Sequence, residues 1–254
     1  MSSKQQLFII TGASRGMGEA IARQLLAPGH RVIGISRRQS AALAAEAQAR
    51  GAALEQWEQD LAEPLAAAER LQAWLAAQPA ASFESATLIN NAGVVARPGP
   101  VEQTPLVELS NAIRVGLEAT LLLSAAFLAK TEALGKARRI LNISSGLGRR
   151  AMAGSAAYCA AKAGMDNLSR AMALDEAGKP AGAAIVSLAP GIIDTEMQSQ
   201  LRAGDPSGFP DHATFVGFKT SGALMSPDEA AAKVLRFLAK PGFGSQVLAD
   251  VREV

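Results

Sequence analysis

The chain has 254 residues, of which 49% are hydrophobic, and a formal net charge of +2. This length and apolar content suit one large α/β domain, and so small a charge gives no reason to expect a nucleic-acid or membrane-surface partner. The N-terminal residues lack a signal-peptide pattern, no uninterrupted apolar run reaches the roughly 20 residues of a membrane span, and the single cysteine, Cys159, precludes an internal disulfide, so we predict a cytoplasmic protein.

Short apolar strands alternate with amphipathic helices along the whole chain. The predicted strands cover residues 6–11, 31–36, 53–59, 87–91, 139–144, 183–189 and 246–249. The predicted helices cover residues 17–27, 41–50, 65–78, 106–134, 155–177 and 227–239. Such alternation predicts a Rossmann-type, doubly wound parallel sheet of about seven strands with helices on both faces. No linker or repeat marks a second domain, so we expect residues 1–254 to form one domain.

A glycine cluster follows the first predicted strand, in the segment 11–18 with the sequence TGASRGMG. Glycines allow a tight turn and a close approach of the backbone to a phosphate, and the following helix adds free N–H groups at its N-terminus. A glycine cluster alone often marks only a turn. Because this one lies between a strand and a helix, it predicts a dinucleotide-phosphate site.

The residues at the end of the second predicted strand indicate which dinucleotide binds. A protein that prefers NAD usually has an acid here, which binds the ribose 2′-hydroxyl. This chain has Ser36, Arg37 and Arg38 instead. Because arginine binds phosphate through paired hydrogen bonds, we predict NADP(H), with Arg37 and Arg15 on the 2′-phosphate. The alternative is that Arg37 and Arg38 are only solvated.

Tyr158 is the only tyrosine, and Lys162 follows it by four residues in a predicted helix, so both side chains lie on one face. A free tyrosine has a pKa of about 10, and a nearby ammonium would lower the pKa of the phenol and make it a better acid–base catalyst. Ser145 ends the apolar run 140–145, from which its hydroxyl can meet the phenol and the ammonium. The pattern predicts a site that protonates a carbonyl. A half-buried ring beside an amine with a structural role is the alternative.

The segment 196–222 is rich in glycine and proline and contains Phe209, Phe215 and Phe218. We predict a long loop beyond the ends of the strands, where ligands bind in open α/β sheets. The three rings favour a substrate loop that closes over an apolar or aromatic substrate. Packing of these rings in the core or against a neighbouring subunit is the alternative.

Together these motifs resemble the short-chain dehydrogenase/reductase family over nearly the whole chain. The resemblance implies that Ser145, Tyr158 and Lys162 are catalytic and that Lys162 also binds the nicotinamide ribose. It places Asp60 and Leu61 at the adenine, the segment 90–93 beside the cofactor, and the segment 190–195 at the nicotinamide carboxamide. The cofactor-binding residues so predicted are Gly12, Ser14, Arg15, Gly16, Met17, Gly18, Arg37, Asp60, Leu61, Asn91, Ala92, Gly93, Tyr158, Lys162, Pro190, Gly191, Ile193 and Thr195. The two histidines, His30 and His212, have no cysteine partners at ligand spacing, so we expect no metal site.

Within the family, the segments 189–198 and 247–251 are most similar to sepiapterin reductase and benzil reductase-like members. This resemblance implies that Asp250 joins Ser145 and Tyr158 in binding the substrate, as an anchor for a pterin amino-amidine group. The alternative is that Asp250 caps the last strand or pairs with Arg252. The family's catalytic asparagine is matched here by Gly116, which implies an irregular helix and a proton relay from Lys162 through backbone carbonyls and water.

The implied function is NADPH-dependent reduction of a ketone, a diketone or a pterin side-chain carbonyl, with Tyr158 as the proton donor. A non-catalytic NADP(H)-binding sensor or scaffold of the same fold is the alternative, although such proteins commonly lose the tyrosine or the lysine. A sugar-nucleotide epimerase would need a larger C-terminal domain. The resemblance also implies a homodimer or homotetramer joined through the helices at 106–134 and 155–177.

Overall fold

A seven-stranded sheet forms the centre of the molecule in a computed structural model that describes residues 5–133 and 137–253. All the strand pairs are parallel, and the strand order is β3-β2-β1-β4-β5-β6-β7. The strands are β1 (Gln5–Thr11), β2 (His30–Ser36), β3 (Ala53–Glu58), β4 (Phe83–Asn90), β5 (Ala137–Ile143), β6 (Ala184–Ala189) and β7 (Leu248–Asp250). The order reverses between β1 and β4, and in such sheets ligands bind beyond the carboxyl ends of the strands at this point. The predicted doubly wound parallel sheet is confirmed.

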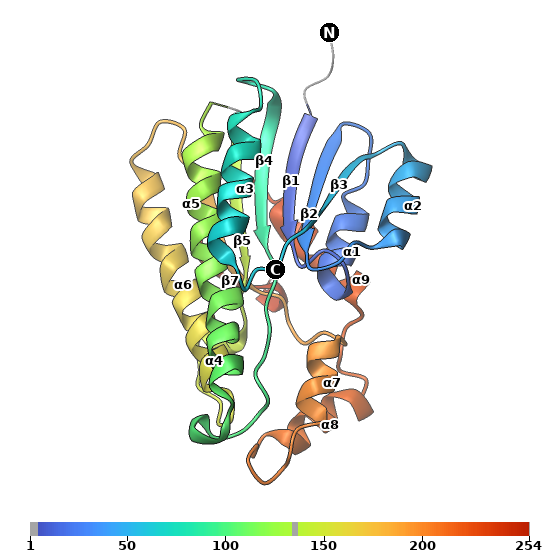
Figure 1. Cartoon of the computed structure of the whole chain (residues 1–254), viewed down its shortest axis with the longest axis vertical. Coiled ribbons are helices and arrows are strands. Elements are labelled where there is room, and N and C mark those ends of the chain that lie inside the picture. The colour runs from blue at the N-terminus through green and yellow to red at the C-terminus, as the bar shows by residue number, and fades with distance from the viewer. Residues whose placement is uncertain (1–4, 134–136, 254) are drawn as a thin grey trace.

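Helices cover both faces of the sheet (Figure 1). The helices α1 (Gly16–Gln24), α2 (Ala41–Arg50) and α9 (Pro227–Leu238) pack against one face, and α3 (Pro64–Ala76), α5 (Ala119–Thr131) and α6 (Ala156–Ala177) pack against the other. Each face therefore has its own buried apolar layer, as the near-continuous apolar strands require.

Local sequence signals set several helix ends where the sequence predicted them. The Ser40 hydroxyl accepts a hydrogen bond from the Leu43 amide at the start of α2, and Gly51 ends that helix in the left-handed conformation. At the start of α9, Ser226 and Glu229 form a reciprocal capping box, with Pro227 as the first helical residue. These caps satisfy amide groups that a helix end otherwise leaves unpaired.

The helix predicted at 106–134 is interrupted by a π-helical turn. It comprises α4 (Leu106–Ile113), the π-helical turn Arg114–Glu118, and α5, while its predicted end at Leu134 lies outside the described residues. The stretch Leu106–Thr131 is long and apolar enough to cross a membrane by length and composition, and half of its most apolar window is buried. Its apolarity follows from its position, because α5 packs against α3 and the sheet.

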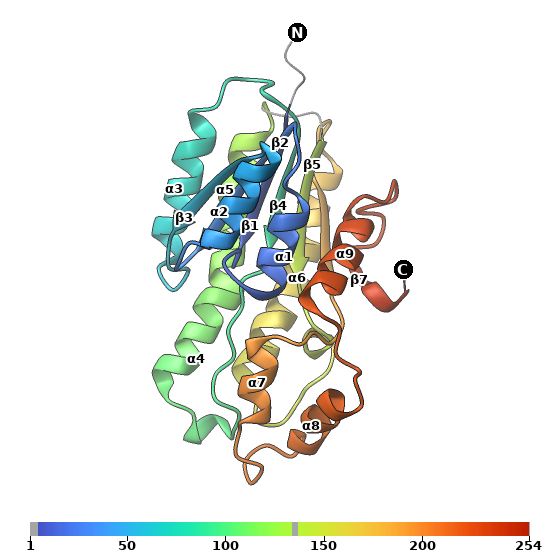
Figure 2. The ribbon, with the colours of Figure 1, turned by 90° about the vertical axis from the view of Figure 1, so that its right-hand side faces the viewer.

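The segment 196–222 differs from the predicted loop because much of it is helical. It contains α7 (Glu196–Arg202) and α8 (His212–Thr220), which lie with α4 beyond the carboxyl edge of the sheet (Figure 2). Phe209 and Phe215 are buried, with ring centroids 5.4 Å apart, and pack with Met152 and Leu201. These two rings therefore form a small core of their own, and the packing alternative is the correct one for them.

Candidate active site

Ser145, Tyr158 and Lys162 come together beyond the carboxyl end of β5. Ser145 follows this strand, and its Oγ accepts a hydrogen bond from the Leu147 amide at 3.1 Å, which caps the 3₁₀ turn Gly146–Gly148. Tyr158 and Lys162 lie in the first turns of α6 on one face, as the four-residue spacing predicts. The Ser145 hydroxyl lies close enough to the Tyr158 phenol to act against the rise in the pKa of that phenol. The three groups thus share one site.

Lys162 is buried, and its environment is set by the backbone as much as by the tyrosine. Its Nζ donates a hydrogen bond to the Ile143 carbonyl at 2.7 Å and lies 5.7 Å from the centroid of the Tyr158 ring. Burial lowers the pKa of Lys162 to about 8, and the carboxylate of Asp166 opposes that shift. Removing water disfavours the charged form of an amine, so the ammonium is held in place at a cost in stability.

The predicted lowering of the phenol pKa by Lys162 is wrong in this structure. Burial is the largest effect and raises the pKa of Tyr158 to about 12, while the neighbouring Ser145 hydroxyl acts in the opposite direction. The ammonium is directed to the Ile143 carbonyl instead. The phenol keeps its proton at neutral pH, as an ordinary tyrosine also does, and it is a weaker acid than a free phenol.

The glycine loop after β1 has the shape of a phosphate-binding turn. Gly12 and Gly16 have positive φ angles of 69° and 57°, a conformation that other residues rarely adopt. A Cβ added to Gly18 would lie 2.2 Å from the Gly12 carbonyl oxygen and 2.4 Å from Asn91 Nδ2, so only glycine fits there. The loop thus brings bare backbone to the N-terminus of α1, which suits a pyrophosphate.

Thr11 fastens this loop to the end of β4. Its Oγ1 accepts hydrogen bonds from the amides of Asn91 and Ala92, both at 2.9 Å, and Asn91 Nδ2 donates to the Thr11 carbonyl at 2.9 Å. A Cβ on Gly93 would lie 3.6 Å from Lys162 Nζ, so this segment also approaches the catalytic lysine. The motif at 90–93 therefore joins the glycine loop to the side of the site where Lys162 lies.

All three arginines at this end of the sheet are exposed, and Arg37 and Arg38 are available to a ligand. Neither Arg37 nor Arg38 forms a side-chain hydrogen bond or an ion pair within residues 5–133 and 137–253. Arg15, which the sequence placed on the same phosphate, instead pairs with Glu196 at the start of α7. Both side chains of that pair are more than half exposed, so the pair is weak and a phosphate can compete for it.

The remaining predicted cofactor residues line the same edge of the sheet. Asp60 is exposed after β3 and accepts a hydrogen bond from the Ala62 amide, while Leu61 beside it is buried. Gly191 has a φ angle of 85°, and Ile193 bridges to Met225. The other predicted residues of this edge are Ser14, Met17, Pro190 and Thr195. Thr195 directly precedes α7, and its Cγ2 would lie 3.6 Å from a Cβ on Gly16, so the two sides of the site meet here.

Asp250 does not have the free carboxylate that a substrate anchor needs. It is buried and accepts hydrogen bonds from the Arg252 amide and Nε, both at 2.9 Å, and from Arg252 Nη2 at 2.6 Å. The pairing lowers the pKa of Asp250, with the Arg252 side chain as the largest cause. The alternative of an Arg252 pair is thus the one the structure contains.

Gly116 lies within the π-helical turn, so the predicted helix irregularity is present at that residue. A Cβ there would lie 3.1 Å from the Ala161 Cβ, which places the turn directly against α6 beside Lys162. No side chain from this position reaches the site.

A small cleft next to Tyr158 is lined by polar and apolar groups in about equal measure. Val95, Val101 and Leu109 line it together with Arg97 and Thr104. On the other side of α6, Cys159 packs with Leu147 and Met197 against the small core formed by Phe209 and Phe215. The cleft beside the phenol therefore offers both apolar and polar contacts to a substrate.

Asp166 and Arg149 are the residues at this site that the sequence analysis missed. Asp166 is buried one turn beyond Lys162, where its Oδ1 accepts a hydrogen bond from Ser187 Oγ at 2.6 Å and its Oδ2 lies 3.4 Å from Arg149 Nε. The four-residue spacing from Lys162 is the one sequence signal that could have found Asp166. Arg149 and Ser187 come from distant segments, and no local pattern marks them.

A model of the short chain dehydrogenase family matches residues 6–206. The chain belongs to this family. Among its relatives, a benzil reductase ((S)-benzoin forming) from Bacillus cereus is 35% identical over 91% of this chain and 92% of its own length. A sepiapterin reductase from Meriones unguiculatus is 30% identical over 95% and 94%.

The chain is also similar to solved structures. A chain from Beutenbergia cavernae, solved with bound NADP at low occupancy, is similar with a TM-score of 0.80 and 28% identity over 97% of this chain and 94% of that one. The chain is therefore an oxidoreductase of carbonyl and alcohol groups by family, and the resemblance to benzil and sepiapterin reductases is confirmed.

Proposed function

We propose that the protein is an NADPH-dependent carbonyl reductase that acts on ketones and diketones. The observation that carries this proposal is the meeting of the Ser145 hydroxyl, the Tyr158 phenol and the buried ammonium of Lys162 at the cofactor edge of the sheet. The benzil reductase relative supports a diketone. The occupied carboxylate of Asp250 favours this class over a pterin, which needs a free acid for its amino-amidine group.

Each catalytic residue has a separate task in the reduction. Bound NADPH supplies the hydride. Ser145 Oγ and the Tyr158 hydroxyl donate hydrogen bonds to the substrate oxygen, and they stabilise the negative charge that grows there because they are fixed before the reaction begins. Tyr158 then gives its proton to that oxygen. The ammonium of Lys162, held by the Ile143 carbonyl, stabilises the phenolate that remains.

Turnover tests the enzyme against the sensor alternative. We expect purified protein to oxidise NADPH when benzil is added, and Tyr158→Phe to reduce kcat by about 10²–10⁴-fold, the usual contribution of a general acid, with little change in NADPH affinity. Tight NADPH binding without consumption of any ketone or diketone would favour the non-catalytic sensor. A retained kcat in Tyr158→Phe would reject the mechanism.

Arg37 is the residue we propose for discrimination between the two nicotinamide cofactors. It is exposed at the end of β2, where the 2′-phosphate of NADPH would lie, and the similar chain from Beutenbergia cavernae was solved with NADP. We expect Arg37→Ala to weaken NADPH binding by about tenfold or more and to leave NADH binding nearly unchanged, since a charge-assisted hydrogen bond contributes about 1.5–3 kcal/mol. Arg38→Ala is the matched control. NADH bound more tightly than NADPH by the wild type would refute the assignment.

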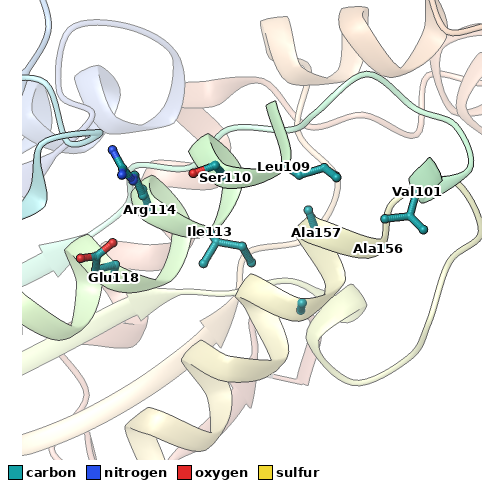
Figure 3. A pocket seen from close by; sticks show the side chains of 9 residues that line it. Val101, Leu109, Ser110, Ile113, Arg114, Glu118, Ala156 and Ala157 are labelled. Carbon is teal, nitrogen blue, oxygen red and sulfur yellow. The ribbon is translucent and has the colours of Figure 1, made fainter. Parts of the chain in front are cut away.

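We also propose a cytoplasmic homo-oligomer joined through α4, α5 and α6. An open hollow of about 570 Å³ lies between α4, the π-helical turn and the start of α6, lined by Leu109, Ile113 and Ala157 among others (Figure 3). Near it Leu106 and Val107 are 84% and 74% exposed, an amount of bare apolar surface that a second copy would cover. Light scattering should give a dimer or tetramer for the wild type and a smaller species for Leu106→Glu. A monomeric wild type would refute this.

A further inference from the structure

The catalytic lysine has a buried acidic neighbour that the mechanism above does not use. Asp166 is 4% exposed and lies on α6 one turn beyond Lys162. Its carboxylate contacts Ser187 of β6 and Arg149, the residue that follows the 3₁₀ turn after Ser145. A buried carboxylate is costly unless it is paired, so its place beside the lysine needs a reason.

The Asp166 cluster holds several parts of the active site in fixed positions. A Cβ on Gly148 would lie 3.0 Å from Asp166 Oδ2 and 2.9 Å from the Lys162 carbonyl, so the turn that carries Ser145 rests on this part of α6. Arg149 Nη2 donates to the Ala249 carbonyl of β7 at 2.9 Å. Through Arg149, Asp166 thus joins the Ser145 turn, the helix of Tyr158 and Lys162, and the last strand.

Few charged groups surround the Asp166 cluster. Lys162 and Tyr158 lie on α6 itself, Arg149 comes from the segment after the Ser145 turn, and Asp250 lies beyond the arginine on β7 with Arg252. The facing group from β6 is the Ser187 hydroxyl, and the group from β5 is the Ile143 carbonyl. Asp166 is therefore the carboxylate one turn from Lys162, and the positive charge of Arg149 partly offsets the negative charge of Asp166.

We propose that Asp166 is a positioning residue of the reaction, which fixes the Ser145 turn against the catalytic helix and keeps Lys162 in its charged form. Arg149 tunes this effect because it draws on the same carboxylate. The inference rests on the proposed reductase function. Burial alone lowers the pKa of Lys162, and the negative charge of Asp166 raises it again. Loss of the acid therefore moves the lysine toward the neutral form at neutral pH.

Opposite shifts in the pH profile separate this role from a structural one. We expect Asp166→Asn, which keeps an acceptor for Ser187, to move the alkaline limb of kcat/KM with NADPH and benzil to lower pH by about one unit. Arg149→Gln leaves the carboxylate unopposed and should move the same limb to higher pH. Asp175→Asn is the matched control, because Asp175 is an exposed acid on the same helix and should leave the limb unmoved.

A second measurement does not depend on activity. The ¹⁵N shift of Lys162 Nζ, assigned with Lys162→Met, should titrate at lower pH in Asp166→Asn and at higher pH in Arg149→Gln. Near-UV circular dichroism checks the fold of each variant, and Arg149→Gln alone decides the question if Asp166→Asn does not fold. Shifts in the same direction, or no shift in either variant, would overturn the proposal. A wild type that titrates as expected but reduces no carbonyl would instead overturn the proposed function.

Discussion

Replacing Lys162 with methionine removes a buried ammonium and leaves a side chain of similar shape, so it isolates the cost of holding that charge in the folded protein. Burial lowers the pKa of Lys162 from 10.5 to about 8. Between these two values the unfolded chain binds more protons than the folded one, and stability rises with pH wherever that holds. The charged lysine therefore destabilises the fold below about pH 8, and this cost disappears as the pH rises.

The two pKa values set the size of the effect. Integrated from about pH 7 to about pH 9.5, they predict that the free energy of unfolding of the wild type increases by about 2 kcal/mol relative to Lys162→Met. The upper limit lies below the ordinary pKa of tyrosine, about 10, so Tyr158 keeps most of its proton in both states, and its small effect is shared by both proteins.

Urea unfolding of both proteins across this pH range, without cofactor, measures the difference. The comparison uses the change with pH and not the absolute stabilities, because the substitution also removes the hydrogen bond to the Ile143 carbonyl. Lys240→Met, at an exposed position after α9, serves as a control and should run parallel to the wild type. Parallel curves for the wild type and Lys162→Met would show that the ammonium is not desolvated as argued.

Three further substitutions test the glycine loop, the small core beside the site and a buried ion pair at the far end of the catalytic helix. Gly18→Ala should weaken NADPH binding and lower the free energy of unfolding by about 1–3 kcal/mol, because its Cβ would lie 2.2 Å from a backbone oxygen. The control is Gly178→Ala, which has open space around its Cβ and should be near neutral. Fluorescence titration and urea unfolding measure both variants, and equal effects would contradict the steric argument. Phe209→Ala should lower the free energy of unfolding by about 3–5 kcal/mol in the same unfolding assay, because this ring is fully buried, and a loss below about 1 kcal/mol would mean that α7 and α8 do not share a core. Arg138→Met should lower the free energy of unfolding by about 3 kcal/mol, because it leaves the buried Glu176 without its buried partner. Adding Glu176→Gln should recover part of that loss. A double variant that is less stable than Arg138→Met alone would contradict this explanation.

The sequence predicted best the elements whose ends carry local signals. The helix at 41–50 was predicted with its observed bounds, because Ser40 and Gly51 cap it. The strand β4 begins at Phe83, before the predicted start at Thr87, because Glu84 and Ser85 break the apolar run although the strand continues through them.

Elements held by distant contacts were not predictable. The helices α7 and α8 are short and lie among glycines and prolines, and α8 contributes Phe215 to a core that also contains Met152, far away in sequence. The hydrogen-bond partner of Lys162 was not predictable for the same reason. The spacing of Lys162 from Tyr158 is local, but its hydrogen bond to Ile143 crosses from α6 to β5. A four-residue spacing in the sequence shows that two side chains share one face of a helix, but it does not identify the hydrogen-bond acceptor that this face meets.

The lack of a side chain at Gly116 has a consequence for engineering. A Cβ at this position would lie 3.1 Å from the Ala161 Cβ, so an asparagine introduced here requires a shift of a few tenths of an ångström between the π-helical turn and the helix that carries Tyr158 and Lys162. A paired change, in which position 161 loses its methyl group when position 116 gains a side chain, would introduce the family's fourth catalytic residue without this shift.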